Sequence, residues 1–128
     1  LGEQLAETIA RASTHNRLST HATALQASWV AIVDATQAIW SFEADVDANA
    51  ALANAVPYMQ AFGHVVLAWT WLDVATCVQA RADGSAPSEG RMRACDFFFH
   101  YELPKIGAWL AVARTRDATA TDMPIEAF

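Results

Sequence analysis

The sequence has little of what catalytic and metal-binding motifs require. Its five glycines form neither a GxGxxG nor a P-loop spacing, and no GxSxG occurs. The two cysteines, Cys77 and Cys95, lie 18 positions apart without a CxxC pattern, so no metal framework is predicted. We therefore expect no catalytic residue, no cofactor-binding residue and no metal ligand in this chain.

Positive charge is also scarce, with a single lysine among 8 basic residues against 14 acidic ones and a net charge of −6. Such a surface repels phosphate backbones and anionic lipid, so we expect neither nucleic acid nor a membrane surface as a main partner. No basic region precedes an apolar run at the N-terminus, which predicts no secretory signal. We expect a cytoplasmic protein in which Cys77 and Cys95 are free, buried thiols.

Hydrophobic residues, in contrast, make up 54% of the chain, and residues 48–72 carry no formal charge. Such a segment is either a buried helix or a membrane span, because a helix without a polar face must be surrounded by protein or lipid. Acidic residues flank the segment on both sides, and polar residues and a proline interrupt it: Asn49, Asn54, Pro57, Gln60 and His64. We therefore expect no membrane span but the central helix of a bundle.

Apolar residues recur at helical spacing through most of the chain, which predicts an all-α fold: one domain, residues 1–128, forming an up-and-down bundle of about four helices. The expected helices cover residues 2–13, about 18–44, about 47–81 and about 89–114, with a loop at 82–88 and an irregular tail at 115–128 laid over the bundle. Pro57 predicts either a kink or a division from a short leading turn at residues 49–56. Pro104 predicts a kink around His100 and Tyr101.

The predicted helices carry more apolar surface than a lone small bundle needs. The third helix has two apolar stripes, and the fourth has aromatic residues outside its seam. This excess indicates a second buried face, against a partner chain or a larger parent protein. The candidate packing or interface residues are Phe62, Trp69, Trp71, Phe97, Phe98, Tyr101 and Trp109.

A few polar residues invite a chemical interpretation, and each has a simpler one. Asp96 and His100 lie four apart, but no Glu-x-x-His motif of di-metal bundles occurs, so we expect a surface pair. His64 is expected to be a core histidine with one hydrogen bond. Glu102 is expected to pair with Lys105, three positions on. His15 and His21 lie in or near a predicted helix break and are given little weight.

Several longer motifs carry a family resemblance. They are Val56-Pro-Tyr-Met-Gln-Ala-Phe-Gly-His-Val-Val66, then Ala68-Trp-Thr-Trp71, Phe97-Phe-Phe-His-Tyr-Glu-Leu-Pro-Lys105, Asp122-Met123 and the terminal Phe128. In this order the chain resembles the extra C-terminal helical domain of the large acyl-CoA dehydrogenases, the acetyl-CoA dehydrogenase-like C-terminal domain. That subgroup includes bacterial enzymes acting on methylmercaptopropionyl-CoA and on fatty acyl-CoA.

The resemblance implies a parent flavoenzyme that removes the α and β hydrogens of an acyl-CoA thioester, with FAD as hydride acceptor. The family's base is a glutamate in a Tyr-Glu-Gly-Thr segment upstream of this domain, and Glu102 lacks the following Gly-Thr. The chain is then a C-terminal fragment, inactive alone, that packs on the catalytic domains and helps to hold subunits together as a homo-oligomer. The alternatives are a free-standing helical module that binds an apolar or acyl ligand, and a di-metal bundle.

Overall fold

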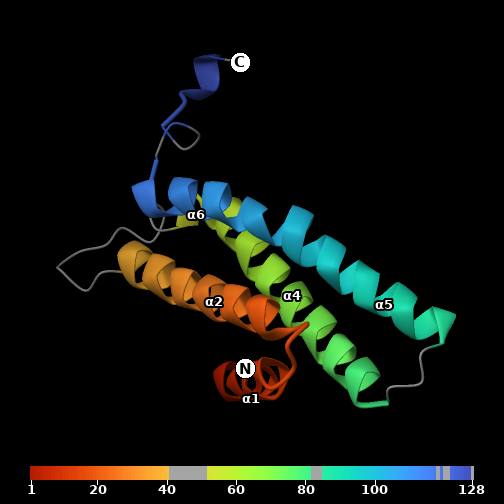
Figure 1. Ribbon diagram of the computed structural model, residues 1–128. Coiled ribbons are helices and arrows are strands. Elements are labelled where there is room, and N and C mark those ends of the chain that lie inside the picture. Colours follow the sequence, from red (N-terminus) through yellow and green to blue (C-terminus); the bar gives the residue numbers. More distant parts are fainter. Residues whose placement is uncertain (41–51, 82–84, 118, 120–121, 128) are drawn as a thin grey trace.

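The computed structural model describes residues 1–40, 52–81, 85–117, 119 and 122–127, and these contain helices and no strand (Figure 1). The α-helices are α1 (Gly2–Ser13), α2 (Ser19–Ile39), α4 (Ala55–Arg81), α5 (Ala86–Phe97) and α6 (Ile106–Thr115). The all-α bundle predicted from the sequence is confirmed. In Figure 1 α4 runs between α2 and the arm formed by α5 and α6, and α1 is seen end-on beside α2.

The central helix of the bundle is α4, which contacts α1, α2, α5 and α6. Its buried positions recur at spacings of three and four, as an α-helix requires for one face. Several of them are alanines, whose small side chains allow neighbouring helices to approach closely. The buried residues of α4 are Ala61, Val65, Ala68, Leu72, Ala75 and Thr76.

Only part of the apolar surface of α4 is covered. The stripe with Val65 and Leu72 packs in the core, as expected. On the second predicted stripe, Leu67 is 49% exposed, while Trp71 and Val78 are half-buried. Trp71 and Val78 pack against the core, so among the described residues this stripe is left open at Leu67, in agreement with the expected surplus of apolar surface.

The proline at the start of α4 marks a boundary rather than a kink. The helix begins at Ala55 and continues to Arg81, so Pro57 lies in its first turn, where a helix needs no amide donor. The amide of Tyr58 donates to the carbonyl of Asn54 at 3.3 Å. Of the two alternatives at Pro57, a division of the helix is the one observed. The expected leading turn and the expected extension of α2 lie partly in residues 41–51, outside the described residues.

The second proline changes the helix type. Pro104 cannot donate to the carbonyl of His100, and the chain forms a π-helical turn, η1 (Phe98–Glu102), followed by a 3-10 turn, η2 (Leu103–Lys105). The amide of Leu103 donates to the carbonyl of Phe98, five residues back. The predicted irregularity at His100 and Tyr101 is thus confirmed in place, and its form is a π-turn.

Other predicted boundaries shift by a few residues. The helix α5 begins at Ala86, with Ser85 as its N-cap residue and Pro87 in its first turn. The last residues of the predicted 82–88 loop are therefore helical. The helix α6 ends at Thr115, and Arg116 follows in the left-handed region with φ 51°. Residues 122–127 are exposed and extend away from α6 in Figure 1, so the prediction that the tail lies over the bundle is wrong for them.

Polar contacts fix the helices around the core. Between α1 and α4, the indole of Trp69 donates to the hydroxyl of Thr8 at 2.9 Å, and Arg11 forms an ion pair with Asp73. Between α6 and α2, the guanidinium of Arg114 donates to the carbonyl of Ala31 at 3.0 Å. These contacts orient the helices on both sides of α4.

The burial of α4 predicts that alanine substitutions at two valines change the free energy of unfolding by different amounts. Val65→Ala removes methyl groups from a side chain that is 1% exposed and leaves a cavity, so we expect a loss of about 2 kcal/mol in the free energy of unfolding. The matched control is Val30→Ala on α2, where Val30 is 46% exposed, and it should change stability by less than about 0.5 kcal/mol. Urea denaturation measures both, and equal losses would contradict the placement of α4 in the core.

Candidate functional site

The side of α4 opposite the core forms an apolar surface. Val56 is 70% exposed, Met59 59% and Leu67 49%, and Thr70 is exposed as well. Half-buried Gly63 lies between them, and a Cβ added there would meet nothing within 4 Å. We call these five residues the exposed α4 face. Exposed apolar side chains grouped on one helix face make this face a candidate interaction site.

A second exposed apolar feature lies at the junction of α5 and the π-turn. The rings of Phe97 and Tyr101 stack with centroids 4.9 Å apart and an interplanar angle of 24°. Both are mostly in solvent, at 55% and 65% exposed. We call these two residues the aromatic pair. Aromatic side chains in such positions are the anchors that protein interfaces use most.

The seven candidate packing or interface residues differ in how far they are buried. Phe97 and Tyr101 are exposed and are available to a partner. Phe98 is buried in the core. The remaining four are half-buried and pack against the core, namely Phe62, Trp69, Trp71 and Trp109. That any of the seven contacts a partner stays a prediction.

A charged cluster connects α4 to the π-turn. The ammonium of Lys105 donates to the carboxylate of Glu102 at 2.7 Å, which confirms the predicted pair. This hydrogen bond and the positive charge of Lys105 lower the pKa of Glu102 despite its partial desolvation. His64 Nε2 lies 3.7 Å from the same carboxylate. Its Nδ1 makes the expected single hydrogen bond, to the carbonyl of Gln60 at 3.1 Å, although the side chain is half-buried rather than in the core.

Asp96 has different partners from the expected one. Its carboxylate binds the Nε2 of His21 at 2.8 Å and the guanidinium of Arg17 at 3.1 Å, and no contact with His100 is found. His21 is 6% exposed and stacks on Phe99 with ring centroids 4.5 Å apart. No local pattern in the sequence indicates this structural contact of His21, because its partner lies 75 residues away.

These contacts control the ionisation of Asp96. Burial raises its pKa, but the hydrogen bonds from His21 and Arg17 outweigh this effect and lower the pKa below the usual value. Arg17 also binds Glu89 at 3.3 Å, so one guanidinium between α1 and α2 holds two carboxylates of α5. The cluster fixes the end of α5 to the α1–α2 turn, which is a structural role.

The two cysteines are free and differ in environment. Cys95 is buried, and desolvation together with neighbouring Asp96 raises the pKa of its thiol to about 12. Cys77 is exposed, so the expectation of two buried thiols is wrong for it. Cys77 lies four residues after Asp73, so the two side chains share one side of α4, which faces away from the core.

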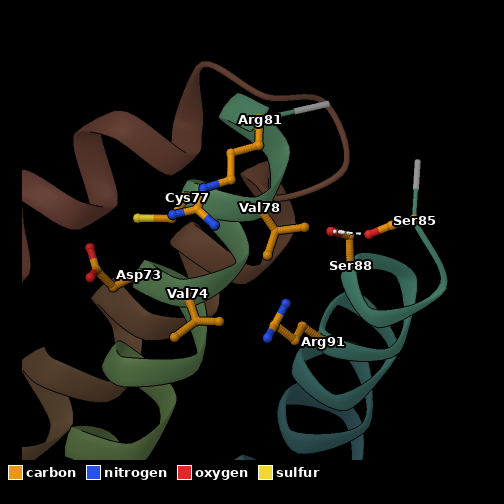
Figure 2. Close-up of a pocket in the computed structure, with 8 residues that line it drawn as sticks. All are labelled: Asp73, Val74, Cys77, Val78, Arg81, Ser85, Ser88 and Arg91. Atoms are coloured by element: carbon orange, nitrogen blue, oxygen red, sulfur yellow. Dashed lines mark hydrogen bonds between the residues drawn. The ribbon is translucent and has the colours of Figure 1, made fainter. Parts of the chain in front are cut away.

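A groove of about 250 Å³ separates the C-terminal half of α4 from the start of α5 (Figure 2). Arg91 reaches from α5 toward α4, and Arg81 lies back along α4 near Cys77. The hydroxyl of Ser85 donates to that of Ser88 at 3.0 Å on the opposite wall. The lining mixes the apolar side chains of Val74 and Val78 with charged ones, namely Asp73, Arg81 and Arg91.

The described residues do not fit a flavin or a metal ion. Three described grooves, of about 250, 310 and 380 Å³, are open to solvent, and the described glycines 2, 63, 90 and 107 lie in helices rather than in a phosphate-binding loop. Among the same residues, no three His, Cys, Asp or Glu side chains come together as metal ligands. This described part of the chain is a set of packed helices.

Comparison with known proteins agrees with this geometry. Residues 1–124 match the family described as acetyl-CoA dehydrogenase C-terminal like. The chain belongs to this family. Searches of curated proteins and of solved structures found no match. The family match confirms the resemblance carried by the motifs around Gly63 and Pro104, and it covers every α-helix that the structure describes in this dehydrogenase C-terminal domain.

Within the domain, α4 is long and apolar enough to cross a membrane by length and composition alone. In the relevant window 33% of the residues are buried inside the protein. The expectation that α4 is not a membrane span stays a prediction. Its support is the contact of α4 with four other helices.

The lowered pKa of Asp96 predicts how stability depends on pH. A group with a depressed folded pKa contributes stability that is present above its unfolded pKa and is lost as pH falls through the folded pKa. Asp96→Asn should therefore lower the free energy of unfolding at pH 7 by about 1 kcal/mol and flatten its acid dependence below about pH 5. Exposed Asp34→Asn on α2 is the control. Parallel pH curves for wild type and Asp96→Asn would contradict the assignment.

Proposed function

We propose that this chain is the accessory C-terminal domain of an FAD-dependent acyl-CoA dehydrogenase, where it packs on the catalytic domains and supports subunit assembly. The observation that carries the proposal is the family match over residues 1–124. In such a parent, a carboxylate base removes the α proton of an acyl-CoA thioester and FAD accepts the β hydride. FAD and the base belong to the catalytic domains in this proposal.

The apolar surface of the domain supports a packing role. The exposed α4 face and the aromatic pair would both be costly to leave in water, at roughly 25 cal/mol for each Å² of apolar area. We assign the aromatic pair to the contact with the catalytic domains. Tyr101 is suited to the edge of such an interface, because its ring can be buried while its hydroxyl stays hydrated.

The contacts of Glu102 support its exclusion as the base of the reaction. Its carboxylate is bound by Lys105, and His64 lies beside it. The ammonium of Lys105 stabilises the charged form and lowers the pKa, whereas a base for an α proton needs a raised proton affinity. We infer that Glu102 joins α4 to the π-turn and keeps the aromatic pair in place.

We also infer a cytoplasmic, reduced environment. The free thiol of Cys77 is exposed, and exposed thiols persist unpaired in compartments that keep them reduced. The acidic surface supports the absence of nucleic-acid and anionic-lipid partners, because like charges repel.

Removal of the aromatic pair should detach this domain from the catalytic domains of the parent protein. In the complete protein, Phe97→Ser with Tyr101→Ser removes the proposed anchors, so we expect a protease to cut between the body and this domain several-fold faster than in wild type. Limited proteolysis followed by mass spectrometry measures the cleavage rate. Val30→Ser, which changes an exposed residue of α2, is the matched control and should leave the rate unchanged.

Two results would contradict the proposal. Cleavage of the double variant at the wild-type rate, with unchanged circular dichroism, would exclude the aromatic pair as the anchor. A gene whose reading frame begins at Leu1, with no dehydrogenase sequence upstream, would exclude the parent altogether. An upstream frame that encodes Tyr-Glu-Gly-Thr is the expected finding.

A further inference from the structure

The exposed α4 face has the same pattern when read from either end. Met59 and Leu67 lie four residues before and after Gly63, and Val56 and Thr70 lie seven before and after it. Positions at four and seven residues share one face of an α-helix. Large side chains therefore flank a glycine symmetrically, with a smaller β-branched residue at each end.

A palindromic face of this kind fits contact with a second copy of itself. A twofold interface requires that the same patch be self-complementary, so that residue i meets residue j and residue j meets residue i. When two α4 helices cross antiparallel at Gly63, Met59 of one copy faces Leu67 of the other, and both such contacts are apolar. Val56 of one copy then lies near Thr70 of the other.

The glycine at the centre lets two helices approach closely. No atom lies within 4 Å of a Cβ built on Gly63, so the position faces open space. Interaxial distance depends on the side chains at the crossing point, and glycine contributes none. The flanking Met59 and Leu67 side chains can fold over the partner helix on either side of the crossing.

The distribution of charge also favours contact between two copies of the chain through this face. Each copy has a net charge of −6, so two copies repel one another over most of their surfaces. Residues 55–72 carry no charge, and the first charged residue of α4 is Asp73, ten positions beyond Gly63. Contact centred on Gly63 keeps the acidic surfaces apart and places no charge in the interface.

We propose that α4 pairs antiparallel with α4 of a second copy of this chain, on a twofold axis at Gly63. The proposal rests on the subunit-assembly part of the proposed function and names the surface that carries it. A single helix pair covers less than the roughly 800 Å² per partner of a standard interface. The isolated chain should therefore self-associate weakly, and contacts elsewhere in the parent would strengthen the pair.

Cysteine cross-linking tests the axis and the orientation together. In a Cys77→Ser background, Gly63→Cys places two thiols across the axis, and copper phenanthroline with oxygen should oxidise them to a disulfide and convert most of the chain to a covalent dimer. Met59→Cys and Leu67→Cys should each cross-link with itself several-fold more slowly. An equal mixture of these two variants should cross-link rapidly. Val30→Cys, exposed on α2, gives the rate of random collision.

Two outcomes would overturn the pairing. Cross-linking of Gly63→Cys at the rate of Val30→Cys would exclude the axis, and faster self-linking of Met59→Cys than of the mixture would exclude the antiparallel orientation. Leu67→Glu gives a second test without cysteine: it should halve the light-scattering mass of the associated species while circular dichroism stays unchanged. If the pairing fails while the aromatic-pair test succeeds, the domain docks on its body and the exposed α4 face is covered by another surface.

Discussion

The hydrophobic side chains of α4 have to be shielded from water around most of the helix, and the other elements are arranged by that requirement. One side of α4 packs against α1, α2, α5 and α6, with small alanines where the helices approach. The other side keeps Val56, Met59 and Leu67 in solvent. Among the described residues, this side of the central helix is not covered by the domain itself, as expected of a domain that packs on a neighbour.

The π-turn determines which of the neighbouring aromatic side chains are buried and which lie on the surface. Pro104 removes one amide donor, and the backbone responds by bonding Leu103 to Phe98 across five residues. Phe98 then lies in the core while Phe97 and Tyr101 stack in solvent. Glu102 is brought to Lys105 and His64 by the same turn, so the charged cluster holds the irregular backbone against α4.

Local sequence patterns predicted the elements well and their partners poorly. Apolar periodicity and the two prolines placed the helices, the division at Pro57 and the irregularity before Pro104, because each effect acts within a few residues. Some boundaries moved by a few residues, as at the start of α5, which begins at Ala86 rather than at the predicted residue 89. The His21–Asp96 contact depends on how distant helices pack, and no spacing in the sequence encodes it. The exposed side chain of Leu67 agrees with the surplus of apolar surface that the sequence predicted for this helix.

The proposed role of the domain requires that the exposed α4 face be buried in the complete protein. Methionine oxidation reports this directly, because Met59 is 59% exposed in the isolated domain and Met92, at 2%, is an internal standard. Peroxide oxidation followed by peptide mass spectrometry should show Met59 oxidised several-fold more slowly in the complete dehydrogenase than in the dilute isolated chain, with Met92 slow in both. Equal rates of Met59 oxidation in the two proteins would contradict the account.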